Sequence, residues 1–398
     1  MKRAGSIAPT VLAMLAGAVV SGCATARPQS APDGGAPEPA ATDAPTHATT
    51  FDTTWYVTSR ARRDGQLIDS LAAQLEYGFV VTQFRERVGP ESDGRLLEGI
   101  DAHPVDSAQL SRDEFISHLR ASDSMAAGLG EGAVLYVHGY ATSFRRAIAQ
   151  GAEIAHRGTF AGPFIVFSWP THRMLAIWPS RGALVSRAYR DDSVSAIENH
   201  NAFRAAISDI TEGARGEAFT VVAHSMGAQL VSEAFARPSA TRDATIANPL
   251  NALVLFAPDL PVERFRDSVA ATLIPLARRR LIYAADNDRM LDMSRWINHS
   301  SRVGEASAAR PMAALGFEVV DVDHGQHVNG ALRKIFEPNH AMRFASTALY
   351  DFFGVVRGMP AECRATTGIA TLAFDGVWEL TAAPIPALPQ PIACVAVR

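Results

Sequence analysis

The chain has 398 residues, of which 47% are hydrophobic and 20% are charged, as expected for a globular protein with a large core. Its net charge of −4 leaves no basic footprint for nucleic acid, so we expect no nucleic-acid partner. One large folded domain flanked by segments outside its core is therefore predicted.

Residues 1–22 have the features of an export signal. Two cations, Lys2 and Arg3, precede an apolar stretch that is too short for a comfortable membrane-spanning helix. The following Val20-Ser21-Gly22-Cys23 resembles a bacterial lipobox, in which Cys23 is lipidated and becomes the first mature residue. An ordinary signal peptide followed by a chance cysteine is the alternative.

Lipidation of Cys23 predicts a membrane anchor made of acyl chains such as palmitate. The next residue is Ala24 and not Asp, which favours the periplasmic side of the outer membrane. Residues 23–50 are rich in Ala, Pro, Thr and Gly and have almost no large apolar side chains. Such a segment cannot bury enough surface to fold, so we predict a disordered tether.

The folded domain is predicted over residues 51–357, where strands and helices alternate. The predicted strands are 54–58, 77–82, 133–137, 164–168, 219–223, 253–257, 281–285 and 317–322. The predicted helices are 112–125, 143–155, 195–212, 226–235, 262–272, 289–296 and 343–356. Residues 171–192 lack a clear period and are expected to form a substrate-shaping loop. The alternation predicts an α/β fold with a mostly parallel central sheet and helices on both faces. The first two strands are expected to pair antiparallel at an edge.

The segment Ala223-His224-Ser225-Met226-Gly227 joins a predicted strand to a predicted helix. A serine on such a sharp turn is the nucleophile elbow of an α/β-hydrolase. The turn needs small residues two before and two after the serine, and alanine replaces the usual first glycine here. The Met226 amide, at the helix start, is free to bind an anion. The alternative is an accidental S-x-G at an ordinary helix start.

A second oxyanion-hole amide is expected from the loop after the strand at 133–137. That strand runs into His138-Gly139-Tyr140, and a glycine there lets the backbone approach the substrate. We predict the Tyr140 amide as donor, or failing that the Ala141 amide. His138 is expected to shape this turn and not to serve as the catalytic base.

The acid and base of a triad should follow the serine in the order Ser, Asp, His. Asp288 follows a strand end and is the favoured acid, with Asp259 and Asp286 as alternatives. Either Asp286 or Asp288 is also expected to cap the helix that follows them. The favoured base is His340, just before the last predicted helix, with His327 as the alternative.

A metal site is the alternative use of the loop after the strand at 317–322. His324 and His327, with Asp321 and Asp323, are ligand types lying close together. They lie in a loop and lack helical ligand spacing, so we expect neither a metal nor a cofactor.

Together these motifs resemble the bacterial α/β-hydrolases of unknown function called DUF900. The matching pieces run over most of residues 54–353 and are Trp55–Arg60, Tyr77-Gly78, Val137–Phe144, Phe167–Thr171, Tyr189, Asp192, Ser195, Ala196, Ala223–Gly227, Ala257–Asp259, Asn287–Leu291, Ser294, His340, Leu349 and Asp351. The resemblance implies an α/β-hydrolase fold with Ser225 as nucleophile, Asp288 as acid and His340 as base. Ala141 stands where the family commonly has Asn. The resemblance implies no substrate.

Residues 358–398 form a C-terminal extension outside the resemblance, with strands predicted at 369–374 and 392–397. Once Cys23 is lipidated, Cys363 and Cys394 remain. In an oxidising compartment an even pair predicts one disulfide, whereas two free buried thiols are the alternative.

The sequence thus predicts an exported, lipid-anchored serine hydrolase that cleaves an ester or related acyl bond through an acyl-enzyme. Its partners would be an acyl-ester or lipid-like small molecule and, through Cys23, a membrane. An amidase or peptidase with the same triad is the first alternative. A non-catalytic binding or scaffold protein is the second, because fold does not fix function.

Overall fold

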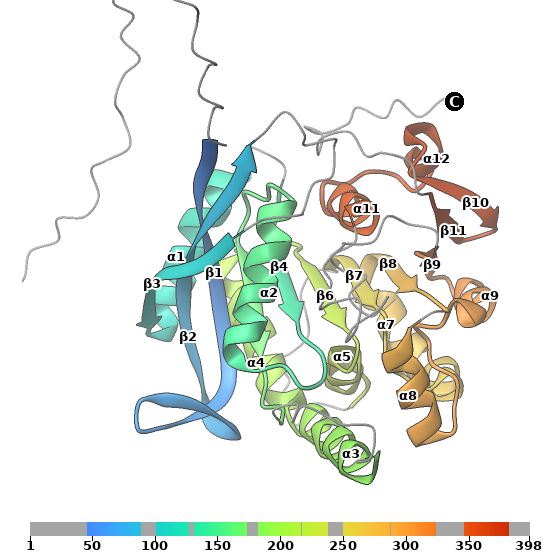
Figure 1. Ribbon diagram of the computed structural model, residues 1–398, viewed down its shortest axis with the longest axis horizontal. Coiled ribbons are helices and arrows are strands. Elements are labelled where there is room, and N and C mark those ends of the chain that lie inside the picture. Colours follow the sequence, from blue (N-terminus) through green and yellow to red (C-terminus); the bar gives the residue numbers. More distant parts are fainter. Residues whose placement is uncertain are drawn as a thin grey trace, which may run out of the picture. The chain divides into compact units, whose positions relative to one another are not determined.

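The structure is a computed structural model, shown in Figure 1. It describes residues 46–88, 101–126, 131–172, 182–215, 217–237, 250–286, 288–323 and 346–381. The predicted lipidation site Cys23, the export signal and the tether up to residue 45 lie outside these ranges. Within them, no helix is both long enough and apolar enough to cross a membrane.

The described strands form one sheet of eleven strands, in the order β10-β11-β9-β8-β7-β6-β4-β5-β1-β2-β3 (Figure 1). Their bounds are β1 Thr46–Arg63, β2 Gln66–Val88, β3 Asp101–Leu110, β4 Val134–Val137, β5 Phe164–Ser168, β6 Thr220–His224, β7 Leu250–Phe256, β8 Ala277–Ala284, β9 Glu318–Asp321, β10 Ala370–Phe374 and β11 Val377–Leu380. From β11 to β1 every neighbouring pair is parallel. Only β2, β3 and β10 run antiparallel to their neighbours. The predicted mostly parallel α/β sheet is confirmed.

Helices cover both faces of the sheet. The described α-helices are α1 Arg112–Ala126, α2 Phe144–Arg157, α3 Gly182–Glu198, α4 His200–Gly213, α5 Gly227–Ala236, α6 Val262–Arg264, α7 Ala270–Leu273, α8 Arg289–Asn298, α9 Ala309–Ala314, α11 Ser346–Val356 and α12 Cys363–Thr367. Strand β4 shows why both faces must be covered. Val134 and Tyr136 pack into the core with α2 and α11, while Leu135 and Val137 pack into the core with α1, α4 and α5. A strand buried on both faces is apolar throughout, and such a run marked β4 in the sequence.

Within the loop predicted over residues 171–192, the described residues 182–192 are helical. Helix α3 begins at Gly182, and the helix predicted over 195–212 is two helices that meet at Asn199. The Asn199 side chain donates to the Ser195 carbonyl (2.7 Å) and accepts from the Ser59 hydroxyl (2.5 Å). These side-chain bonds tie the break between α3 and α4 to the end of β1.

The C-terminal extension adds β10 and β11 to the sheet beyond β9. The buried Arg364 of α12 holds it there, through two bonds to Asp351 of α11 (2.7 and 3.0 Å) and one to Glu318 of β9 (2.8 Å). Cys363 is buried, but Cys394 and the strand predicted at 392–397 lie outside the described residues. The disulfide therefore stays a prediction.

Candidate active site

The strand ends of the parallel sheet place Ser225 in a strained turn. Strand β6 ends one residue before it, and α5 begins at Gly227. Ser225 has φ +53°, a region that costs energy for any residue with a side chain. The turn is fixed because the Ser225 amide donates to Phe256 O (2.9 Å), and its carbonyl accepts from the amides of Ala228 (3.0 Å) and Asp259 (3.2 Å).

A glycine is required at position 227, two residues after the serine, because two backbone segments pack closely there. A Cβ on Gly227 would lie 2.6 Å from the His138 carbonyl oxygen and 2.8 Å from the Val137 carbonyl oxygen. Those two carbonyls lie at the end of β4 and at the start of the β4–α2 loop, residues 138–143. A side chain at position 227 would therefore push this loop away from the turn.

The β4–α2 loop lies directly against Ser225. A Cβ on Gly139 would be 2.9 Å from the Ser225 Cβ, so only glycine allows this approach. The amides of Tyr140 and Met226, the two predicted donors, give no hydrogen bond to any acceptor in the described parts of the chain. The Ala141 amide, the alternative donor, is engaged, because it donates to the carboxylate of Asp192 (3.1 Å).

His138 fixes the orientation of this loop, as the sequence predicted. Its Nε2 accepts from the Trp169 amide (3.2 Å), so the ring proton is assigned to Nδ1, which lies 3.0 Å from the Gly139 carbonyl oxygen. All peptide bonds in the described ranges are trans. The C=O and N–H of a trans peptide point in opposite directions, so the Tyr140 N–H points away from the His138 ring.

Two buried charges hold the same loop from either side. Asp192 accepts from the Ala141 amide (3.1 Å) and the His172 amide (2.7 Å), and lies 2.6 Å from His172 Nδ1. The Arg60 guanidinium donates to the Thr142 carbonyl (2.7 Å). Asp192 and Arg60 are 0% and 1% exposed. This arrangement holds Ala141 at φ +50°.

Burial dominates the electrostatics of these groups. It raises the pKa of Asp192, and the hydrogen bonds from His172 and Ala141 oppose it only in part. It lowers the pKa of Arg60 against the opposing charge of Asp69. Burial, together with the Asp192 charge, raises the pKa of Tyr140 to about 12, so this phenol stays protonated at neutral pH.

Asp288, the favoured acid, lies at the end of the sheet that carries Ser225. It is 1% exposed and caps α8, because its Oδ1 accepts from the amides of Met290 (2.9 Å) and Leu291 (3.0 Å). The predicted helix cap at position 288 is confirmed. Asp288 follows the end of β8 at Ala284 by four residues, and the fold is expected to carry its triad acid after a strand end of this kind.

The two alternative acids have other partners. Asp259 accepts from the hydroxyls of Tyr189 (2.6 Å) and Ser294 (2.5 Å), and lies 3.3 Å from Arg302 Nε. This buried network ties together α3, α8 and the segment after β7. Asp286 is exposed and accepts from the Ser307 amide (3.0 Å). Both carboxylates thus have structural partners, and the choice of Asp288 as the acid stays a prediction.

The histidines that could serve as base, His340 and its alternative His327, lie outside the described residues, as does His324. The described ranges contain no group of three or more His, Cys, Asp or Glu side chains arranged to hold a metal ion.

Sequence reasoning assigned no role to Asp192 or Arg60. They are 51 and 82 residues away from their partners in the β4–α2 loop, so no local pattern connects them. The available signal was an acid three residues after Tyr189, which places both on one face of a helix.

The chain is similar to solved structures and to a protein family. A structure of an alpha/beta-superfamily hydrolase from Xanthomonas campestris is 13% identical, with a TM-score of 0.29, over 56% of this chain and 97% of that one. A CIB-like hydrolase from Thermoplasma acidophilum is 11% identical, with a TM-score of 0.32, over 78% and 99%. Likeness at this level carries no information on substrate, and no curated protein matches the chain. A family model does match residues 109–334, and the chain belongs to that family, described as alpha/beta hydrolase of unknown function (DUF900).

Proposed function

We propose that the protein is a serine hydrolase that cleaves an ester or a related acyl bond. The observation that carries the proposal is the turn at Ser225. There a buried serine is held at a positive φ, and Gly139 of the β4–α2 loop lies in contact with it. The Tyr140 and Met226 amides next to it donate to no acceptor in the described residues. Backbone amides that are free to donate beside a nucleophile can stabilise an oxyanion.

In the proposed mechanism, Ser225 Oγ attacks the carbonyl carbon while His340 takes the hydroxyl proton. Asp288 orients the imidazole and stabilises its charged form. The Tyr140 and Met226 amides bind the oxyanion. His340 then donates the proton to the leaving group. Water then attacks the acyl-enzyme while His340 takes its proton. His340 passes this proton to Ser225 Oγ as the acyl group is released, which restores the free serine.

Labelling with an uncharged fluorophosphonate tests this proposal on the purified mature protein. The wild type should label, and Ser225→Ala should not. His340→Ala and Asp288→Asn should label far more slowly, since the serine loses its base or the base loses its orientation. If His340→Ala labels as fast as the wild type, the base would be assigned to His327 instead. A folded wild-type protein that does not label would contradict the proposal.

We further propose export and lipidation at Cys23, which the lipobox-like sequence supports. Cells fed labelled palmitate should incorporate it into the wild-type protein and not into Cys23→Ser. We also propose a disulfide between Cys363 and Cys394. Thiol titration of the denatured, unreduced mature protein tests it, and two free thiols would rule the disulfide out.

A further inference from the structure

The segment that follows β5 holds the β4–α2 loop at both ends. The Trp169 indole N–H donates to the His138 carbonyl (2.9 Å), and the Thr171 hydroxyl donates to the Thr142 carbonyl (2.7 Å). Strand β4 lies between β5 and β6 in the sheet, and all three are parallel. The segment after β5 therefore meets the loop from the side of β5, whereas the proposed nucleophile follows β6.

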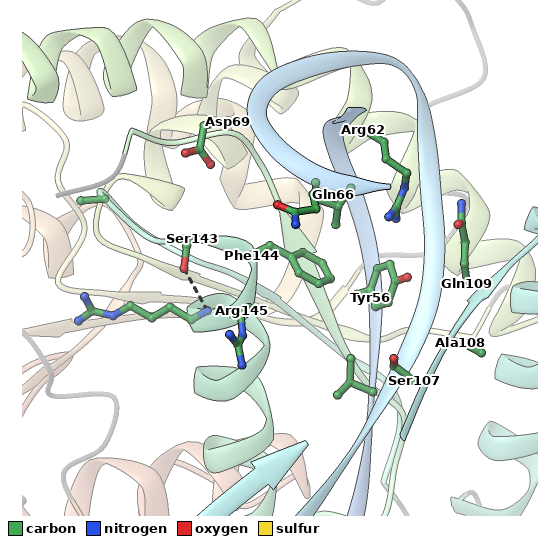
Figure 2. A pocket seen from close by; sticks show the side chains of 14 residues that line it. Tyr56, Arg62, Gln66, Asp69, Ser107, Ala108, Gln109, Ser143, Phe144 and Arg145 are labelled. Atoms are coloured by element: carbon green, nitrogen blue, oxygen red, sulfur yellow. Dashed lines mark hydrogen bonds between the residues drawn. The ribbon is translucent and has the colours of Figure 1, made fainter. Parts of the chain in front are cut away.

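The β1–β2 hairpin holds the same loop through a permanent charge. The buried Arg60 guanidinium donates to the Thr142 carbonyl (2.7 Å), the Ser168 hydroxyl (3.0 Å) and the carboxylate of Asp69 (2.5 Å), which Figure 2 shows. A guanidinium keeps its charge and its donors at neutral pH. The hold from this side is therefore always present.

The hold from the side of β5 ends on an exposed histidine. The amide (2.7 Å) and Nδ1 (2.6 Å) of His172 both meet one oxygen of Asp192, and the other oxygen accepts from the Ala141 amide (3.1 Å). Both carboxylate oxygens accept from amides, so the proton between the two side chains is assigned to Nδ1. The imidazole is 53% exposed, and its Nε2 bonds to no described residue. A surface side chain thus supplies a donor to a carboxylate that is 0% exposed.

Asp192 needs this donor because burial opposes its ionised form. Burial raises the pKa of Asp192, whereas the amide, the Nδ1 donor and the charge of His172 act in the opposite direction, as does the Ala141 amide. Charge-assisted hydrogen bonds are roughly twice as strong as neutral ones, so an ionised Asp192 binds the Ala141 amide more strongly. That bond holds Ala141 at φ +50°, a conformation that costs energy. Without the Nδ1 donor the hold on the loop weakens.

We propose that His172 is a positioning residue, whose Nδ1 donor fixes the Asp192 carboxylate and thereby the β4–α2 loop. The loop in turn keeps the Tyr140 amide directed at the oxyanion. The inference rests on the proposed hydrolase function and deepens it, because it assigns the orientation of the oxyanion site to a residue that does not touch the substrate. The exposed Nε2 has no part in this role.

Two substitutions separate the Nδ1 donor from the rest of the ring. Asparagine carries an NH₂ group at the same distance along the side chain as Nδ1 and has no counterpart of Nε2. His172→Ala should lower the rate constant of labelling by an uncharged fluorophosphonate by about tenfold, because one charge-assisted bond is lost. His172→Asn should restore labelling to within about threefold of the wild type. With p-nitrophenyl acetate, His172→Ala should lower kcat by a similar factor and change KM by less than about twofold.

A second histidine–aspartate pair provides a matched control. His156 Nδ1 also lies 2.6 Å from a carboxylate, that of Asp52. Asp52 precedes Thr54, which pairs with Phe164 at the first position of β5. This pair therefore lies at the amino end of the parallel strands, whereas Ser225 follows the carboxyl end of β6. Folded His156→Ala protein should label at the wild-type rate.

A double-variant cycle shows whether His172 acts through Asp192. In an Asp192→Ala background the imidazole has no carboxylate to orient, so His172→Ala should change the labelling rate constant by less than about twofold. With excess probe, this rate constant does not depend on how much of the sample is active. Thermal unfolding shows whether each variant is folded, and the comparison of His172→Ala with His172→Asn does not require the Asp192→Ala protein.

Three results would overturn the role of His172. They are wild-type labelling by His172→Ala, an effect of His172→Ala that is as large without Asp192 as with it, and a failure of His172→Asn to restore labelling. The last result would assign the function to Nε2, in contact with substrate. The hydrolase proposal fails separately, if the folded wild-type protein does not label, and the role of His172 then fails with it.

Discussion

Replacing Asp192 by asparagine should impair catalysis, although this buried residue acts through the β4–α2 loop and not through a contact to substrate. The carboxylate is 0% exposed and accepts at both oxygens, from the Ala141 amide on one and from the amide of His172 on the other, where His172 Nδ1 also approaches to 2.6 Å. An asparagine has one oxygen and one NH₂ group. Whichever way it turns, the NH₂ faces a donor that the aspartate had satisfied.

The oxygen should turn to the two donors of His172 and leave the NH₂ against the Ala141 amide. An unpaired buried donor costs about 1–3 kcal/mol, which the loop can relieve by moving away. That movement also displaces the neighbouring Tyr140 amide. The loss of one oxyanion donor typically lowers kcat by about 10²–10³-fold, so a large part of that range is expected.

Rates of fluorophosphonate labelling and of ester hydrolysis measure the effect, with unfolding midpoints to show that the variant is folded. KM should change much less than kcat, because the lost interaction forms with the oxyanion and not with the bound substrate. A folded Asp192→Asn protein that labels within twofold of the wild-type rate would refute the role of Asp192 in orienting the loop.

Asp192 should also make the stability depend on pH. Its pKa is raised, chiefly by burial, so the folded protein binds this proton more tightly than the unfolded chain does. A group of this kind contributes stability that is complete below its unfolded pKa and is lost as pH rises through its folded pKa. As pH falls through the acid range, the stability difference from Asp192→Asn should therefore shift in favour of the wild type. Urea midpoints at several pH values measure it, and a constant difference would contradict the raised pKa.

Three other substitutions separate catalysis from folding. Gly139→Ala, whose Cβ would lie 2.9 Å from the nucleophile, should slow labelling by about 10²-fold, whereas Gly132→Ala, with no atom nearer than 3.4 Å, should label normally. Asp259→Asn leaves Arg302 buried without its counter-charge and should cost about 3–5 kcal/mol in urea unfolding. The folded fraction should still label, and lost labelling in folded protein would make Asp259 the triad acid. Arg364→Met should lower the unfolding free energy by a similar amount, because Asp351 on α11 stays buried without its charge partner. An unchanged unfolding free energy would show that the C-terminal extension does not stabilise the sheet.

The sequence was sufficient wherever one local pattern determined the structure. The buried strands are apolar runs, and the turn at Ser225 needs only a small residue on each side of it, so both could be predicted from neighbouring residues. Gly139 could be predicted in the same way, because a glycine directly after a central strand indicates a close backbone approach.

Elements that depend on distant partners could not be predicted. The buried face of α3 includes Ser186, Tyr189 and Asp192. These positions have helical spacing but are polar, so hydrophobic periodicity does not detect the helix. Strand β3 contains Pro104 and mostly exposed side chains, and it is a strand because it pairs with β2 at the edge of the sheet. In both cases the stabilising contacts come from segments far along the chain.

The buried charges near Ser225 are hard to explain by stability. Arg60, Asp192, Asp259, Asp288 and Arg302 are all at most 2% exposed. Desolvation offsets most of what such groups gain from pairing, and apolar residues of equal volume often stabilise a fold as well. Charges retained against this cost need another reason, and their contacts supply one. Two of them hold the β4–α2 loop, two fix the segment that follows β7, and one caps the helix after β8. Buried charges also hold the C-terminal extension, through Arg364 and Asp351, but the five named above each fix a backbone segment at the strand ends that carry Ser225. Fixed backbone amides are what the proposed oxyanion site would require.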